Sequence, residues 1–110
     1  MMQNRRIDLH THSLLSDGGL LPSELLRRVD ALGYAALAIT DHADATNLER
    51  LIASLQRLLA EQPDDFCTTL LVGLELTHVA PRSIGKLARR ARELGADVVV
   101  VHGETIVEPV

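Results

Sequence analysis

Short apolar runs alternate along this chain with longer stretches in which apolar residues recur every three or four positions. The runs are rich in valine, leucine, isoleucine and alanine and lie near residues 7–9, 35–40, 70–74 and 97–101. Their length and their lack of strict polar alternation predict strands that helices cover. Because the runs begin roughly every 30 residues, the length of a βα unit, they predict a parallel sheet of the α/β class.

The stretches between the runs have the signals of amphipathic helices. Pro22 and Pro81 open the first and third of them, at a position where a missing N–H group breaks no helical hydrogen bond. Gly33 and Gly95 follow these two stretches and are typical helix stop signals. Consecutive βα units wound in one direction form either a barrel or an open doubly wound sheet. Both arrangements bring the carboxyl ends of the strands to one face.

Residues that bind metal ions stand where each predicted strand ends. His10 and His12 follow the first run, and residues two apart in an extended chain point to the same side. His42 follows the second run, Glu75 the third and His102 the fourth. Each of these residues alone would also fit a cap or a loop. Their common position at four successive strand ends predicts a metal site on the face where the strands end.

The types of ligand indicate which ions and which chemistry to expect. Mixed imidazole and carboxylate ligands favour zinc, manganese or iron over magnesium or calcium. Glu75 lies in an apolar run, where an unpaired carboxylate would be costly, and is the expected bridge in a cluster of two or three ions. Such a cluster supplies hydroxide near neutral pH and neutralises phosphate oxygens. The predicted reaction is therefore hydrolysis of a phosphate ester.

Two further residues are candidates for binding a small phosphorylated substrate. His78 lies three positions after Glu75 and is expected in the loop above the site. Arg82 lies in the first turn of the third predicted helix, where a cation and helix N-terminal amides could hold an anion. Each also fits an ordinary surface residue.

Composition limits the remaining possibilities. A chain of 110 residues allows one domain, and its net charge of −4 argues against nucleic acid as a partner. No apolar stretch approaches the roughly 20 residues that a membrane-spanning helix needs, so no membrane association is expected. The single cysteine, Cys67, can form no internal disulfide, and the expected location is therefore the cytoplasm.

Taken together, the motifs resemble the opening motifs of the PHP family, named for polymerase and histidinol phosphatase. The similar segments are Ile-Asp-Leu-His-Thr-His-Ser with Ser-Asp-Gly at 7–18, Ala-Ile-Thr-Asp-His at 38–42, Gly-Leu-Glu at 73–75 and Val-Val-Val-His at 99–102. The resemblance implies a metal-dependent phosphoesterase on a distorted (β/α)7 barrel resembling a TIM barrel. Residues 1–110 would then be a single domain that supplies the first four βα units of this barrel.

The resemblance also implies individual roles. His10 and His12 would bind one metal ion, and Glu75 would bridge it to a second ion that His102 also binds. A third ion would be bound by Asp17 and His42.

Three of these ligands, Asp17, Glu75 and His102, are the residues that the resemblance places closest to catalysis. Asp41, beside His42, would orient a neighbouring ligand.

The family's later motifs, a further histidine and a terminal Asp-x-His, have no counterpart in this sequence. The resemblance therefore implies half of a barrel, ending at Val110 in the loop after the fourth strand. We expect such a half-barrel to self-associate or to pair with a separate C-terminal half, because its last strand would be an open edge. Two alternatives stay open: an amidohydrolase or TatD-like hydrolase or nuclease, whose barrel also begins with His-x-His, and a half-barrel that binds metal without catalysis.

Overall fold

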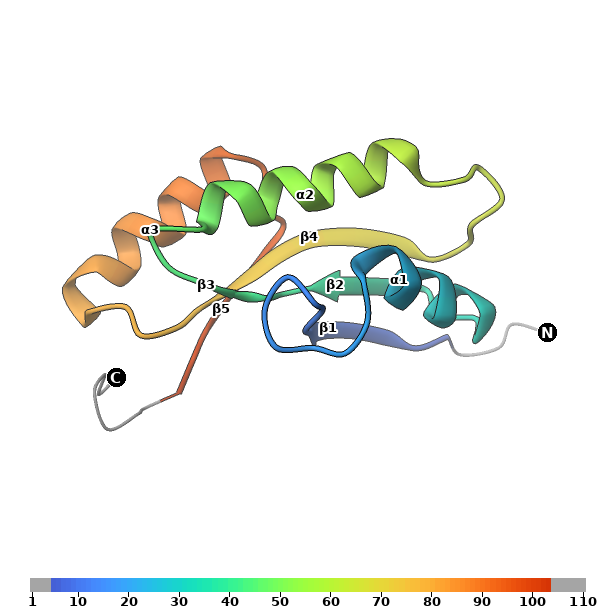
Figure 1. Ribbon diagram of the computed structural model, residues 1–110, viewed down its shortest axis with the longest axis horizontal. Coiled ribbons are helices and arrows are strands. Elements are labelled where there is room, and N and C mark those ends of the chain that lie inside the picture. The colour runs from blue at the N-terminus through green and yellow to red at the C-terminus, as the bar shows by residue number, and fades with distance from the viewer. Residues whose placement is uncertain (1–4, 104–110) are drawn as a thin grey trace.

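Every predicted apolar run forms a strand, and every predicted amphipathic stretch forms a helix, in the computed structural model, which describes residues 5–103 (Figure 1). The strands are β1 (Ile7–Thr11), β2 (Ala36–Ile39), β3 (His42–Ala43), β4 (Thr69–Leu76) and β5 (Val98–Val101). The helices are α1 (Pro22–Ala31), α2 (Leu48–Glu61) and α3 (Pro81–Glu93). The prediction that the chain ends at Val110 in the loop after the fourth strand concerns residues outside the described part.

The strands pair in parallel, and the main strands follow the order of the sequence. β1 pairs with β2, and β4 has β2 and β3 along one edge and β5 along the other. The short strand β3, which the sequence did not predict, continues the register of β2 against β4, with Ile39 opposite Val72 and His42 opposite Glu75. A doubly wound sheet would reverse its strand order at a switch point. The sequential order is the one expected for part of a barrel.

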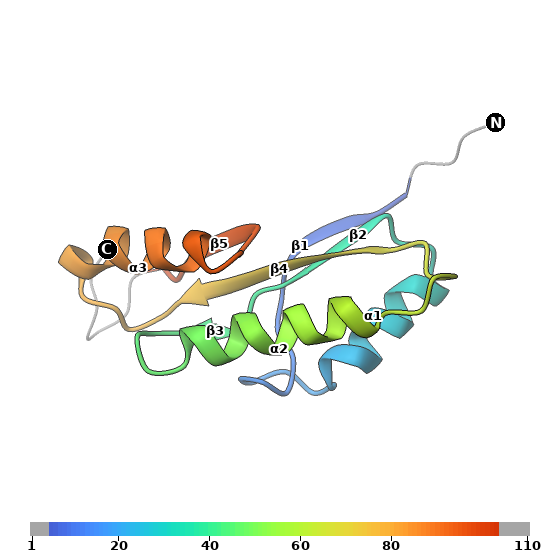
Figure 2. The same ribbon diagram turned by 90° about the horizontal axis from the view of Figure 1, so that it is seen from above.

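The hydrophobic core lies between the sheet and the helices. Alternate residues of β4, from Leu70 to Leu76, point into this core, where they meet Leu26 of α1 and Ile52 of α2. Helix α2 packs along β4 and contacts α1 on one side and α3 on the other (Figures 1 and 2). The intervening residues of β4, among them Glu75, therefore point to the opposite face, which we call the inner face.

The predicted helix signals are found at the expected places. Pro22 and Pro81 are the first residues of α1 and α3, and Gly33 and Gly95 follow these helices with positive φ angles of 82° and 109°. None of the helices within residues 5–103 has the length and apolar character needed to cross a membrane.

A bulge in β1 decides where the first two histidines point. Asp8 lies opposite Leu37 and Thr11 lies opposite Ile39, so that three residue steps in β1 match two in β2. Paired residues of parallel strands point to the same face of the sheet. The bulge therefore shifts the in-and-out alternation of β1 side chains by one residue, so that Thr11 points to the core side with Ile39. His10 and His12 are thereby directed to the inner face, where Glu75 also lies.

Candidate metal centre

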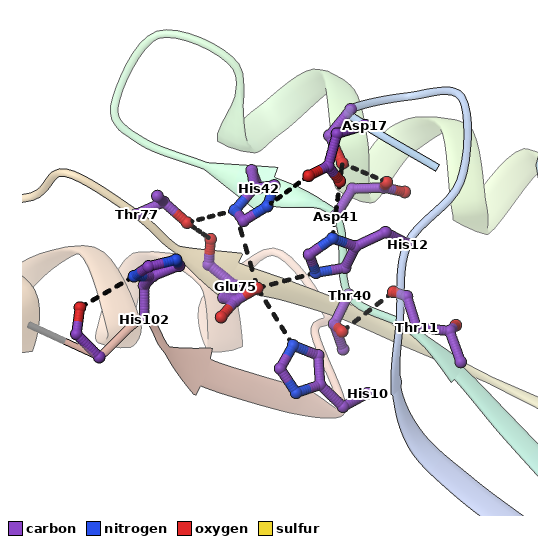
Figure 3. A network of polar contacts seen from close by, with 12 residues as sticks. His10, Thr11, His12, Asp17, Thr40, Asp41, His42, Glu75, Thr77 and His102 are labelled. Atoms are coloured by element: carbon purple, nitrogen blue, oxygen red, sulfur yellow. Dashed lines mark hydrogen bonds and ion pairs between the residues drawn. The ribbon is translucent and has the colours of Figure 1, made fainter. Parts of the chain in front are cut away.

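The centre of the candidate site is the carboxylate of Glu75, which is only 5% exposed near the end of β4. Its Oε1 atom lies 3.1 Å from Nε2 of His10 and 2.7 Å from Nε2 of His12 (Figure 3). Nδ1 of His42 is 3.7 Å from the same oxygen. The inner face therefore gathers imidazoles from β1, from the residue after it and from β3 around one buried acid.

A second group of ligands adjoins the first through His12. The Nδ1 atom of His12 lies 2.7 Å from Oδ1 of Asp17, and Nε2 of His42 lies 3.1 Å from Oδ2 of the same carboxylate. His12 thus presents one ring nitrogen to Glu75 and the other to Asp17. Asp17 comes from the loop between β1 and α1.

Thr77, which the sequence did not single out, holds the ring of His42. Its hydroxyl donates to the carbonyl of Glu75 at 3.0 Å and lies 2.7 Å from Nδ1 of His42. Because this hydroxyl proton is directed to the carbonyl of Glu75, Nδ1 of His42 is the donor to Thr77, and Nε2 is the nitrogen left to bind a metal ion in place of a proton. This nitrogen faces Asp17, as a metal ligand requires.

These residues form two sets of donors in which the ligand atoms lie within 4.8 Å of one another. One set is His10, His12 and Glu75, and the other is His12, Asp17 and His42. Three imidazole and carboxylate donors at this spacing fit the coordination of a zinc, manganese or iron ion. The fold therefore brings together five of the predicted ligands in two candidate metal sites, and the number and kind of ions stay predictions.

Comparison with known proteins agrees with this arrangement. Residues 8–101 match the family described as the PHP domain. This chain belongs to the PHP domain family. The matched region contains the two ligand sets and all five strands except the first residue of β1.

Individual relatives of this PHP domain are known. The uncharacterized protein MJ1295 of Methanocaldococcus jannaschii is 51% identical over 108 residues, which cover 96% of this chain and 49% of that protein. A 3',5'-nucleoside bisphosphate phosphatase of Chromobacterium violaceum is 45% identical, with 84% of this chain and 38% of the phosphatase covered. The chain therefore spans about half or less of the length of these relatives.

The remaining ligand candidate, His102, lies just after β5 and outside both ligand sets of the described residues. Its ring centroid is 5.7 Å from that of His42, and its Nδ1 donates to the carbonyl of Gly103 at 2.8 Å. Nε2 is thus the nitrogen left for an ion. Its assignment to a second ion with Glu75 stays a prediction.

The two substrate-binding candidates lie in different surroundings. His78 has a positive φ of 55° and stacks on His102, with ring centroids 6.3 Å apart. Both rings line a pocket of about 480 Å3, which His42 and Thr77 also line. Arg82 is exposed in the first turn of α3 and is not among the described residues that line this pocket. The pocket supports a role for His78 more directly than one for Arg82.

Mutual contacts shift the pKa values of the central groups. Burial lowers the pKa of His12, but hydrogen bonds to Asp17 and Glu75 and the charges of both acids outweigh burial and raise it. The hydrogen bond with His12 lowers the pKa of Asp17. Burial raises the pKa of Glu75, but its hydrogen bonds with His10 and His12 outweigh burial and bring it below its usual range. These contacts therefore favour the ionised form of both acids and the protonated form of His12.

We therefore expect metal binding to weaken as the pH falls. The raised pKa of His12 means that its proton persists to higher pH than on a free histidine, and an ion must displace that proton. Affinity should rise with pH up to the pKa of His12 and level off above it. Zinc titrations by calorimetry at about pH 6 and about pH 8, in buffers of different ionisation enthalpy, would measure affinity and proton release. Equal affinity and equal proton release at both values would contradict this expectation.

Proposed function

We propose that this PHP domain is the metal-binding part of a phosphoesterase that hydrolyses a small phosphate ester. The observation that carries the proposal is the pair of ligand sets that share His12 beside buried Glu75. The name of the relative from Chromobacterium violaceum, a 3',5'-nucleoside bisphosphate phosphatase, supports phosphate esters as the substrate class. Membership of the PHP domain family favours this reaction over that of an amidohydrolase.

The proposed roles follow the geometry of the donors. His10, His12 and Glu75 would hold one ion, while Asp17 and His42 would hold another next to it. When bound, divalent ions supply a water of lowered pKa and neutralise the charge of phosphate oxygens. Asp17 and Glu75, with His102, would carry the catalytic function through these contacts. His78 would contact the substrate from the wall of the adjoining pocket.

The side chains of the site favour water as the attacking group. The hydroxyls of Ser13 and Ser16 both donate to Asp41, so neither proton is directed to a histidine base. Cys67 is exposed and lies just before β4 begins, at the opposite end of the sheet from Glu75. None of these nucleophiles has an activating partner in the structure.

Removal of metal is therefore expected to abolish hydrolysis. Any activity that the protein has towards p-nitrophenyl phosphate or a 3',5'-nucleoside bisphosphate should fall at least about 10-fold after treatment with a chelator that is then removed. Manganese or zinc should restore the activity. Activity that resists the chelator and follows the protein through purification would contradict the proposal. Turnover of a dihydropyrimidine instead of phosphate esters would favour the amidohydrolase alternative.

A further inference from the structure

Asp41 is a second buried carboxylate beside the metal centre, and it belongs to neither ligand set. It lies between β2 and β3 and is only 1% exposed. Its carboxylate accepts hydrogen bonds from the backbone N–H of Ser13 at 2.7 Å, from the Ser13 hydroxyl at 2.6 Å and from the Ser16 hydroxyl. A buried carboxylate is costly without such partners, and hydrogen bonds to a charged acceptor are strong. The side chain is therefore fixed by the loop that follows β1 and not by a histidine.

That loop is the segment that carries Asp17. The carbonyl of Ser13 accepts hydrogen bonds from the backbone N–H groups of Ser16 and Gly18, which closes the loop tightly. Gly18 approaches the end of β1 so closely that an added Cβ would lie 2.2 Å from the carbonyl oxygen of His12. The position of Asp17 relative to His12 is thus set by a compact turn, and Asp41 joins this turn to the sheet (Figure 3).

Asp41 also reaches the two other ligand-bearing segments through its main chain. Its carbonyl accepts the backbone N–H of Glu75 at 2.9 Å, and it directly precedes His42 in the sequence. One residue therefore contacts the loop of Asp17 by its side chain, the strand of Glu75 by its carbonyl, and His42 by a peptide bond.

We propose that Asp41 is a positioning residue that holds Asp17 at the distance from His12 and His42 needed to bind an ion. This inference rests on the proposed metal binding. His10 and Glu75 lie in strands that ladder hydrogen bonds hold in place, whereas Asp17 depends on the loop. Loss of the Asp41 carboxylate should therefore weaken the set of His12, Asp17 and His42 much more than the set of His10, His12 and Glu75.

Two variants and a matched control test this inference. Asp41→Asn keeps the size of the side chain but replaces one acceptor by a donor, which conflicts with the Ser13 and Ser16 donors. Ser16→Ala removes one loop anchor and leaves Asp41 in place. Asp30→Asn is the control, because Asp30 also accepts two backbone N–H groups, those of Cys67 and Thr68, but at the other end of the sheet.

The measurements are manganese and zinc titrations of chelator-treated protein, and amide hydrogen exchange in the loop. We expect Asp41→Asn to lower the affinity for the ion at His12, Asp17 and His42 by about 10-fold or more. The affinity for the other ion should change by less than about 3-fold. Amide exchange at residues 16–18 should become faster even without metal. Ser16→Ala should change both readouts in the same direction by less, and Asp30→Asn should change neither.

Two results would overturn the inference while leaving the proposed function intact. One is an Asp41→Asn protein with unchanged loop exchange that binds both ions as tightly as the wild type. The other is an equal loss of both ions in Asp41→Asn while Ser16→Ala behaves as the wild type, which would assign Asp41 to general stability. Wild-type protein that binds neither manganese nor zinc would instead overturn the proposed function, and the inference with it.

Discussion

Replacing His12 by alanine is expected to remove most of the metal bound by this protein, whereas His10→Ala should remove only part of it. The reason is that His12 belongs to both ligand sets through its two ring nitrogens, while His10 belongs to one. The double replacement of both histidines should leave almost no metal. Elemental analysis of protein purified without chelators measures the ions bound per chain.

His78→Ala is the matched control for these variants. It removes an imidazole from the wall of the adjoining pocket but from neither ligand set, and metal content should stay at the wild-type value. Stoichiometric metal in the double variant would show that the ions are bound elsewhere. Equal losses in His10→Ala and His12→Ala would show that the two sets do not bind separate ions.

A protein consisting of residues 1–110 is expected to self-associate. Ile7 on the inner face is 62% exposed and its neighbour Leu9 is 48% exposed, which leaves apolar surface on β1 uncovered. Within residues 5–103, the outer edges of β1 and β5 also pair with no strand, and open edges of this kind recruit other chains. Light scattering on a size-exclusion column should therefore give a mass above the 12.0 kDa of one chain, and this mass should rise with concentration.

Substitutions on β1 and after α1 distinguish association through the β1 surface from nonspecific hydrophobic association. The double variant Ile7→Gln and Leu9→Gln should shift the protein towards a monomer. Leu32→Gln is the control, because Leu32 is more exposed than either but lies after α1. Since a second copy cannot supply the family's later His and Asp-x-His motifs, the self-associated form should show little phosphatase turnover. A concentration-independent monomer with brisk turnover would contradict both expectations.

Much of the site follows from local patterns. Prolines and glycines mark the helix ends because their backbone preferences act within a few residues. The gathering of His10, His42 and Glu75 follows from a general property of parallel sheets, whose strands all end on one face. The motifs at these strand ends were also specific enough to indicate the PHP domain family from the sequence.

The precise arrangement depends on contacts between distant segments. The bulge that turns His10 and His12 to the inner face arises from the register of β1 against β2, which no single run encodes. The family resemblance implied that Asp41 orients a neighbouring ligand, but only the structure shows which groups its carboxylate contacts, namely Ser13 and Ser16 in the loop of Asp17.

The contact of Thr77 with His42 and the contacts of His12 with two acids likewise depend on distant segments of the chain. The sequence by itself determined the three helices, the four main strands and the candidate ligands at the strand ends, because those depend on neighbouring residues. Only the tertiary structure decided which nitrogen of each imidazole faces which acid. That choice depends on side chains separated by up to 65 positions, which come together only when the strands pair in one register.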